Sequence, residues 1–308
     1  MGLFYILLGK ILPLYSNIVL GYLCTRCLSV DRGTVAAILF YIIGPIVVFS
    51  ATVNVRIDPA VISLPVFFYC FGSILAFIFL KLFKKNWPDA TSNILAFTAG
   101  TGNTGYFGIA LALILFDQKT ADIFIFTVLA SMFYEATTGF YITAKGSFSA
   151  AESLGKILKL PALYAFAAAL VVNLSGIAVP EGILSYAGQF KIGYSLLGMM
   201  VIGMGLDGLR RSGGVDRKFL AVSILTKHLL WPLLIWGLIL LDRAYVHLLD
   251  EQLYKVMFVF AIVPLAGNTV TLAVLLRAKP EKAALAVLLS TIVSIVSIPM
   301  MMALYELV

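Results

Sequence analysis

The chain has 308 residues, of which 61% are hydrophobic and only 12% are charged, and its mean hydropathy is +1.03. A soluble domain of this length needs more charge on its surface, so the composition predicts one integral membrane domain. The formal net charge of +7 comes from basic residues in short loops between apolar segments, which excludes a nucleic-acid-binding patch. The three cysteines form neither a disulfide framework nor a metal site.

About 20 apolar residues are needed to cross a membrane as a helix. By this measure the sequence predicts an all-α membrane protein with ten transmembrane helices. They cover residues 3–25, 34–54, 60–83, 91–116, 121–144, 156–174, 183–207, 218–241, 253–277 and 281–305. The apolar N-terminus runs into the first span without a cleavage-site pattern, so no removable signal peptide is expected.

The basic residues of the loops predict how the chain lies in the membrane. One set of alternate loops carries fifteen of the 22 Lys and Arg residues, and the opposite set carries four. Because cytoplasmic loops hold the excess of positive charge, both termini are expected to face away from the cytoplasm.

Two predicted spans contain the same tripeptide at their middle. Gly102-Asn103-Thr104 lies in span 4 and Gly267-Asn268-Thr269 in span 9. Breaks at matching places in two halves of five spans indicate an inverted repeat, because an odd number of spans puts the halves in opposite orientations. The sequence therefore predicts a first repeat over residues 1–148 and a second over 149–308, with the broken helices crossing at the midplane.

The residues of these breaks suit an unwound helix that holds a ligand. Glycines such as Gly105 let the backbone leave the helix, and Pro264 removes one helical hydrogen bond. Half-helix N-termini present free N–H groups that attract anions. The candidate substrate-binding residues are Asn103, Thr104, Gly105, Pro264, Asn268 and Thr269. The alternative is that the glycines and asparagines only pack helices together.

Few ionisable side chains lie deep in the predicted spans, where charge is expensive, and four of them are candidates for coupling or charge compensation. Glu135 and Lys227 either neutralise each other as a structural pair, or carry a coupling ion (H+ or Na+) and neutralise an anionic substrate. His228 either packs as a hydrogen-bonded side chain or shares that coupling role. Lys191 either snorkels to the membrane surface or draws anions into a cavity. Span 10 adds a stripe of hydroxyls from Ser290 to Ser297, which serves packing or ion binding.

At these residues the chain resembles the auxin efflux carrier family, which includes plant auxin exporters and bacterial permeases for malonate and malate. The resemblance covers nearly the whole chain in span count, orientation and paired breaks. Its most specific parts are Asn103-Thr104-Gly105-Tyr106-Phe107-Gly108-Ile109 in span 4, Pro264 with Asn268 in span 9, and Ser290-Thr291 with Pro299 in span 10. The chain departs from the family pattern at Ala110, where members usually have proline.

The resemblance implies a crossover fold in two parts. Spans 1, 2, 6 and 7 form a scaffold and homodimer interface, while spans 3–5 and 8–10 form a mobile transport part. The implied function is transport of small organic anions, such as malonate, malate or auxin-like acids, by an elevator mechanism in a prokaryotic plasma membrane. The alternative is a sodium-coupled symporter of bile-acid-like anions, or a cation/proton antiporter, on the same fold. No enzyme motif, metal site, cofactor or nucleic-acid partner is expected, and lipid surrounds the spans.

Overall fold

The computed structural model describes residues 2–144, 161–205, 215–276 and 278–305, and all regular structure in these ranges is helical. Six described helices are long and apolar enough to cross a membrane: Phe4–Leu28, Arg32–Asn54, Pro59–Phe83, Gln118–Ala144, Arg217–Val246 and Pro280–Tyr305. The chain is therefore an all-α integral membrane protein, which confirms the prediction from its composition. The predicted repeat boundary after residue 148 lies outside the described residues.

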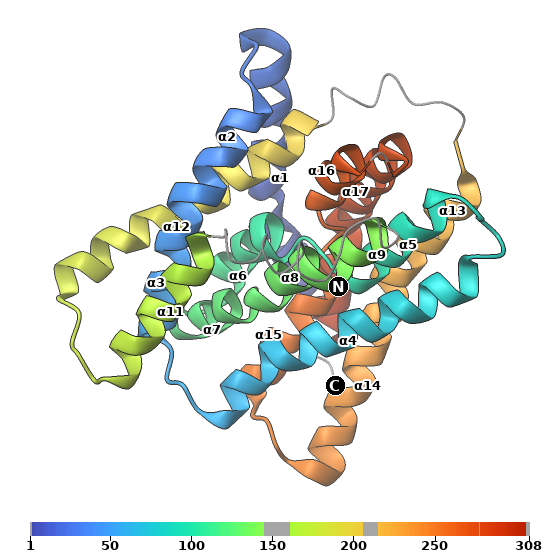
Figure 1. The fold of residues 1–308 in the computed structure, drawn as a ribbon. Helices are drawn as coiled ribbons and strands as arrows, with labels where there is room; N and C mark the ends of the chain where they lie inside the picture. The colour runs from blue at the N-terminus through green and yellow to red at the C-terminus, as the bar shows by residue number, and fades with distance from the viewer. Residues whose placement is uncertain (1, 145–160, 206–214, 277, 306–308) are drawn as a thin grey trace.

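The helices before residue 145 cover the first five predicted spans (Figure 1), and those labelled η are single π-helical turns. They are α1 (Gly2–Leu28), α2 (Arg32–Ile38), η1 (Leu39–Ile43), α3 (Gly44–Asn54), α4 (Pro59–Phe83), α5 (Ala90–Gly100), η2 (Thr104–Gly108), α6 (Ile109–Leu115), α7 (Gln118–Thr127), α8 (Leu129–Tyr134), η3 (Glu135–Gly139) and α9 (Phe140–Ala144). Predicted span 4 is therefore interrupted between α5 and η2.

The helices after residue 160 cover the other predicted spans. They are α11 (Pro161–Leu174), α12 (Glu181–Met204), α13 (Arg217–Leu225), η5 (Thr226–Leu230), α14 (Trp231–Leu241), η6 (Asp242–Val246), α15 (Glu251–Ile262), α16 (Asn268–Leu275) and α17 (Pro280–Tyr305). Predicted span 9 is interrupted between α15 and α16, at the place that corresponds to the interruption of span 4.

Aspartates in the short polar loops define where many of these helices begin. Each accepts a hydrogen bond from a backbone N–H of the first helical turn, which satisfies a group that has no partner inside the helix. Six helices start in this way, namely α2, α4, α5, α7, α13 and α15, after Asp31, Asp58, Asp89, Asp117, Asp216 and Asp250.

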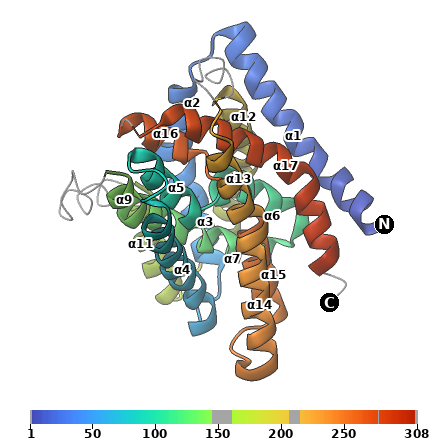
Figure 2. The ribbon, with the colours of Figure 1, turned by 90° about the vertical axis from the view of Figure 1, so that its right-hand side faces the viewer.

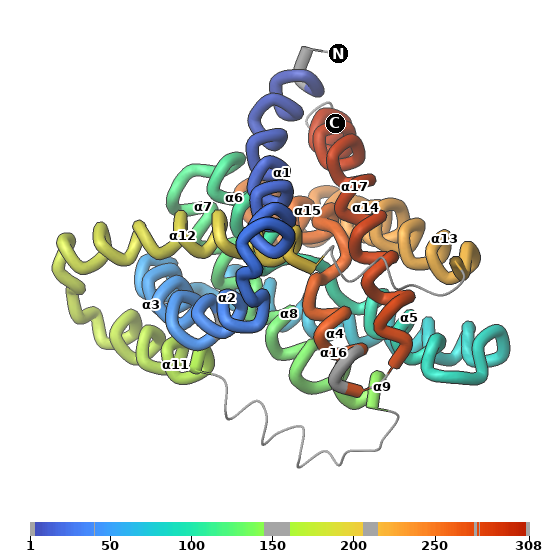
Figure 3. The backbone as a smooth tube through the Cα atoms, turned by 90° about the horizontal axis from the view of Figure 1, so that it is seen from above, coloured from blue at the N-terminus to red at the C-terminus, as the bar shows by residue number. Residues whose placement is uncertain are grey.

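The helices pack in two groups that face each other. In Figures 1 and 3, α3, α11 and α12 lie on one side, and α4, α5, α13 and α14 lie on the other. Within the first group α3 packs against α11, and α12 packs against both α1 and α3. The start of α1 and the end of α17 lie near each other (Figures 2 and 3), and these two helices are also in contact. The helix α7 touches α3 of the first group and α4 of the second, and η2 and α6 touch α12 of the first group.

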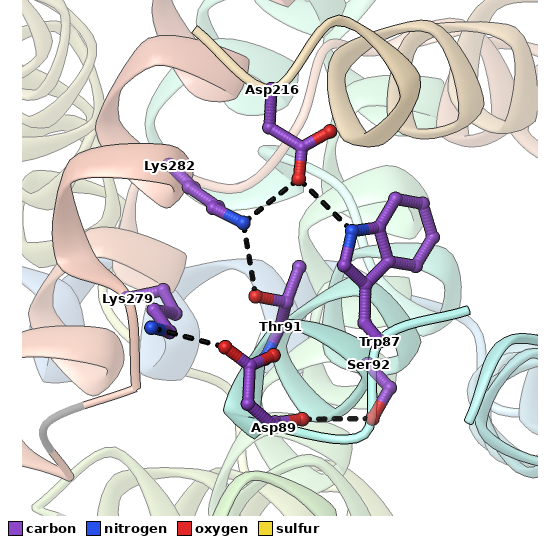
Figure 4. Close-up of polar contacts among 7 residues, drawn as sticks. All are labelled: Trp87, Asp89, Thr91, Ser92, Asp216, Lys279 and Lys282. Atoms are coloured by element: carbon purple, nitrogen blue, oxygen red, sulfur yellow. Dashed lines mark hydrogen bonds and ion pairs between the residues drawn. The ribbon is translucent and has the colours of Figure 1, made fainter. Parts of the chain in front are cut away.

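The starts of α5, α13 and α17 are tied together by polar contacts, which we call the helix-end network (Figure 4). It comprises Trp87, Asp89, Thr91, Asp216, Lys279 and Lys282. The Nζ atom of Lys282 lies 2.8 Å from the Asp216 carboxylate and donates to Thr91 at 3.1 Å. The Trp87 indole donates to the same carboxylate at 3.0 Å. Lys279 pairs with Asp89 at 3.0 Å, so each charged group here has a partner.

These contacts favour the ionised carboxylates of the helix-end network. Burial raises the pKa of Asp89, but the hydrogen bond from the Thr91 N–H and the pairing with Lys279 outweigh it and hold this pKa at about 2, against an ordinary value of 3.8. Burial also opposes ionisation of Asp216, where hydrogen bonds from Lys282 and the Phe219 N–H outweigh it and lower the pKa. The network is therefore most stable when both aspartates are charged.

Candidate functional site

The first break interrupts predicted span 4. The helix α5 ends where Thr101 adopts an extended conformation (φ −145°, ψ 171°), and helical structure resumes at Thr104. The side chain of Asn103 accepts a hydrogen bond from the Phe107 N–H at 3.3 Å, and its backbone carbonyl accepts one from the Gly108 N–H at 2.8 Å. Asn103 thus caps the second half of the span, which explains why an asparagine stands at the break.

The second break interrupts predicted span 9. The helix α15 ends where Val263 becomes extended (φ −63°, ψ 150°), and α16 begins at Asn268. Pro264 lacks an N–H group, so the helix cannot continue its hydrogen bonding through this residue. The Leu265 N–H instead donates to the hydroxyl of Ser290 on α17 at 2.9 Å. A side chain of predicted span 10 therefore holds the unwound segment.

The two breaks touch each other. The backbone N–H of Asn103 donates to the carbonyl of Pro264 at 2.8 Å. The Asn103 side-chain nitrogen is directed toward Gly267, 3.8 Å from where a Cβ atom on that residue would lie, and this buried amide has no hydrogen-bond partner among the described residues. The hydroxyl of Thr269 is also buried without a partner there. Two segments far apart in sequence thus meet through the backbone. The Asn103 amide and the Thr269 hydroxyl remain as donors without an acceptor among the described residues.

The carbonyl end of α5 is satisfied by side chains from two other helices. The Tyr134 hydroxyl donates to the carbonyl of Phe97 at 3.1 Å, and the indole of Trp231 donates to the carbonyl of Ala99 at 2.8 Å. Both aromatic side chains are almost fully buried. Carbonyls freed by the first break are therefore bonded within the protein, as apolar surroundings require.

Lys227 lies at the contact between the breaks. Its side chain is fully buried, and its Nζ atom has no hydrogen-bond partner among the described residues. The ammonium group lies 4.1 Å from the centre of the Trp231 ring, a distance at which the ring face attracts a cation. A Cβ atom on Gly102 would lie 2.5 Å from this Nζ atom and 2.9 Å from the Val263 side chain, so a larger residue at position 102 would displace Lys227 or Val263.

Glu135 reaches both breaks from η3. One carboxylate oxygen accepts a hydrogen bond of 2.9 Å from the side-chain amide of Asn268, and the other lies 3.4 Å from the hydroxyl of Thr101. Asn268 is exposed, whereas Glu135 is partly buried. The structural pair of Glu135 with Lys227, one of the two sequence interpretations, is not observed, because each side chain has different neighbours.

His228 is buried in a network of hydroxyls. Its two ring nitrogens lie 2.8 Å from the Ser290 hydroxyl and 2.9 Å from the Ser297 hydroxyl. Ser290 also receives the N–H of Leu265, so the imidazole is connected to the second break through one hydroxyl. This arrangement agrees with a hydrogen-bonded packing role for His228. It also shows that Ser290 and Ser297, in the hydroxyl stripe on α17, bond to another helix.

Lys191 does not snorkel to the membrane surface. Its side chain is buried and forms an ion pair with Asp122 on α7, an aspartate that Gln118 also contacts at 3.1 Å. The snorkelling interpretation is therefore wrong, because the ammonium is turned inward to an anion. This pair joins α12 of the first helix group to α7.

The structure brings together most of the residues that the sequence singled out. The residues around the contact between the breaks are Asn103, Glu135, Lys227, Pro264 and Asn268. Thr104 and Gly105 lie there too. The Thr104 hydroxyl donates to the Ser131 hydroxyl at 2.8 Å, and a Cβ atom on Gly105 would lie 3.5 Å from the Tyr194 hydroxyl.

Sequence reasoning missed Thr101, Trp231 and Tyr194 near the breaks, and Asp122, the partner of Lys191. Two of them had a usable signal, since Thr101 directly precedes Gly102 in the first break and Trp231 lies four residues after Lys227 on one helix face. Tyr194 and Asp122 are brought in by tertiary packing, which spacing along the chain does not reveal.

A scan of the chain against protein-family models and a search of curated proteins find no match. The function is therefore inferred from the two breaks and the charged side chains around them.

Proposed function

We propose that this protein is a secondary transporter of small organic anions, carboxylates above all, which bind where the two interrupted spans meet. The observation that carries the proposal is the hydrogen bond of 2.8 Å from the Asn103 N–H to the Pro264 carbonyl. It joins breaks at the middle of two predicted spans from opposite halves of the chain. A helix that only crosses lipid gains nothing from such a break, because freed backbone groups are costly in hydrocarbon.

The groups around this contact suit a carboxylate. The N–H groups of Thr104, Thr269 and Val270, at the starts of η2 and α16, already donate to carbonyls of the breaks, but the helix N-termini still favour negative charge. Among the described residues, the buried Asn103 amide has no acceptor and the buried Lys227 has no anionic partner. A ligand with two carboxylate oxygens provides acceptors for the donors and a counter-charge for the ammonium.

The exposure of Asn268 supports access of a ligand from water. Non-helical backbone at membrane depth is tolerated where it is buried in protein or lines an aqueous cavity. Asn268 starts α16 at the end of such a segment and is exposed, and its amide binds a carboxylate rather than lipid. The proposal therefore places an aqueous cavity next to Asn268 and Glu135.

The transport step follows from a division of the helices into scaffold and transport parts, as in the auxin efflux carrier family. Under the proposal, the scaffold and dimer interface consist of α1, α2–α3, α11 and α12. The other helices form the transport part, which carries both breaks. Packing of α1 on α12 and of α3 on α11 supports such a scaffold. The transport part then moves against it as an elevator, with both termini outside the cytoplasm.

One observation favours a second function, exchange or symport of a cation on the same crossover fold. Glu135 places a carboxylate beside both breaks, and a carboxylate binds protons or sodium. A cation/proton antiporter would respond to pH or sodium without needing any organic anion. The anion proposal is preferred because the unpartnered groups at the contact are donors and a cation.

Counterflow uptake in proteoliposomes tests the proposal. Vesicles are loaded with malonate, malate, lactate or indole acetate, and accumulation of the same labelled compound is followed. We expect accumulation of at least one carboxylate, and its loss in the variants Asn103→Ala and Asn268→Ala. Asn86→Ala is the matched control, because Asn86 is exposed and remote from the breaks in sequence. Unchanged uptake in well-folded Asn103→Ala and Asn268→Ala would contradict the proposed site.

A further inference from the structure

Glu135 occupies the place where the proposed function puts a substrate carboxylate. Its carboxylate accepts the amide N–H of Asn268 at 2.9 Å, and Asn268 is one of the two asparagines assigned to the substrate. The same carboxylate lies 3.4 Å from the Thr101 hydroxyl in the first break. One side chain of the protein thus spans the two breaks with the chemical group that the ligand is expected to bring.

The hydrogen bond from Asn268 favours the charge of Glu135, whereas a second anion in the site would oppose it. The carboxylate lies at the start of α16, where the helix dipole favours negative charge. No lysine or arginine forms an ion pair with it in the described parts of the chain. A second carboxylate at Asn268 would meet a like charge at close range, which strongly disfavours keeping both ionised.

The other titratable groups near Glu135 are tyrosines and Lys227. The hydroxyls of Tyr106, Tyr134 and Tyr194 lie within electrostatic range of its carboxylate. On α4 the hydroxyl of Tyr69 accepts from Thr137 in the same π-helical turn as Glu135, and Lys81 lies about 18 Å further along that helix. Tyr141 on α9 is exposed. Phenols stay neutral at physiological pH, and Lys227 lies at the same contact but forms no hydrogen bond with Glu135. Glu135 is therefore the titratable group whose charge state decides its hydrogen bond with Asn268.

We propose that the proton is the coupling ion and that Glu135 carries it; this inference rests on the proposed function. A proton from water binds a carboxylate oxygen of Glu135, and the neutral carboxyl group releases the Asn268 amide to the substrate carboxylate. The anion and the proton then cross together, and the proton leaves when the anion has left. One proton moves with each bound carboxylate, so a monocarboxylate crosses without net charge.

The contacts of Glu135 favour a proton over sodium. A sodium ion needs several oxygen ligands, whereas the group opposite the carboxylate is the NH2 of Asn268, a donor that cannot bind a cation. A protonated carboxyl group needs only one acceptor, and the Thr101 hydroxyl lies in reach. Sodium dependence is therefore not expected.

Proton movement with the wild-type protein is the first test. A carboxylate that shows counterflow is added outside proteoliposomes that contain a pH-sensitive dye, with the membrane potential clamped at zero. We expect internal acidification of one proton per anion, and about tenfold accumulation of a monocarboxylate per pH unit of gradient, beyond that of protein-free vesicles. Uptake without proton movement would overturn the inference and leave the proposed function standing. Absence of counterflow for all four carboxylates would overturn both.

The variant Glu135→Gln tests the residue. Its amide is neutral at every pH, so counterflow should no longer weaken as the pH rises, and accumulation driven by a pH gradient should be lost. Glu181→Gln is the matched control, because Glu181 is an exposed glutamate at the start of α12, and it should keep the proton coupling. Gradient-driven accumulation in Glu135→Gln equal to wild type would overturn the assignment. If that variant does not fold, the number of protons that enter with each anion in the wild-type protein decides whether the proton is the coupling ion.

Discussion

The helix-end network and the contact between the two breaks are both polar, yet they are built in opposite ways. In the network, each of the charged groups Asp89, Asp216, Lys279 and Lys282 has a partner of opposite sign (Figure 4). At the breaks, Lys227 and the Asn103 amide are buried without any hydrogen-bond partner in the described residues. Buried polar groups are normally satisfied, so the first region is organised for stability and the second for a ligand.

Other buried polar atoms without a partner do not weaken this contrast. Apart from Lys227, Asn103 and Thr269, the described residues contain five such hydroxyls and the indole N–H of Trp236. A hydroxyl or an indole is far less costly to bury than an ammonium group. The ammonium group of Lys227 and the amide of Asn103, the two costlier groups in this set, therefore both lie where the breaks meet.

Among the variants, Lys227→Met should show the largest effect on stability and binding. If neither changed, the contrast between the helix-end network and the contact between the breaks would not hold. Methionine keeps the length of the side chain but removes a buried charge that has no partner, so we expect the free energy of unfolding to rise by about 1–4 kcal/mol. Carboxylate binding should fall by about 10- to 100-fold, because a charged donor to the ligand is lost. Thermal unfolding in detergent and counterflow measure the two quantities. A destabilised variant with normal transport would show that Lys227 is structural.

Asp216→Ala should have the opposite signature. It removes the cap of α13, the pairing with Lys282 and the bond from Trp87, so we expect the free energy of unfolding to fall by about 2 kcal/mol. Counterflow per folded protein should not change. Asp31→Ala is the control, since Asp31 caps α2 and none of the ion pairs between described residues includes it, and it should lower the thermal unfolding temperature less. An equal fall in the unfolding temperature of both variants would show that the ion pair of Asp216 with Lys282 does not stabilise the fold.

Acidification should weaken the helix-end network slightly. Because the folded pKa of Asp89 is about 2 and its ordinary value is 3.8, its stabilising effect is present above pH 4 and is lost as the pH falls toward 2. Asp89 is largely exposed to solvent, so screening limits the effect to a fall in Tm of about 1 °C. Comparing the pH dependence of Tm between wild type and Asp89→Asn measures it. An identical pH dependence in both proteins would contradict the role given to this ion pair.

The sequence predicted the features that depend on local chemistry. Glycine at 102, proline at 264 and an asparagine in each break indicated where the helices would be interrupted, and the structure interrupts them there. Loop aspartates such as Asp89 and Asp216, which were not singled out as caps beforehand, also cap helices through local contacts. These outcomes depend on residues a few positions apart, where backbone preference and side-chain reach decide the result.

Partners between distant segments could not be predicted in the same way. Glu135 was paired with Lys227 in one interpretation because both lie at similar depth, but it binds Asn268 instead. One of the two interpretations of Lys191 placed it at the membrane surface, but it pairs with Asp122 on another helix. Depth along a span gives one coordinate, and the rotation and tilt of each helix, which select the partner, are set by packing.

Direct binding of a labelled carboxylate to the purified protein tests most directly whether the contact between the breaks is a ligand site. The account predicts saturable binding by wild type and by Asn86→Ala, and at least about tenfold weaker binding by Asn103→Ala and Asn268→Ala, since each loses a hydrogen bond to a charged ligand. Equal affinity in all four proteins would contradict it.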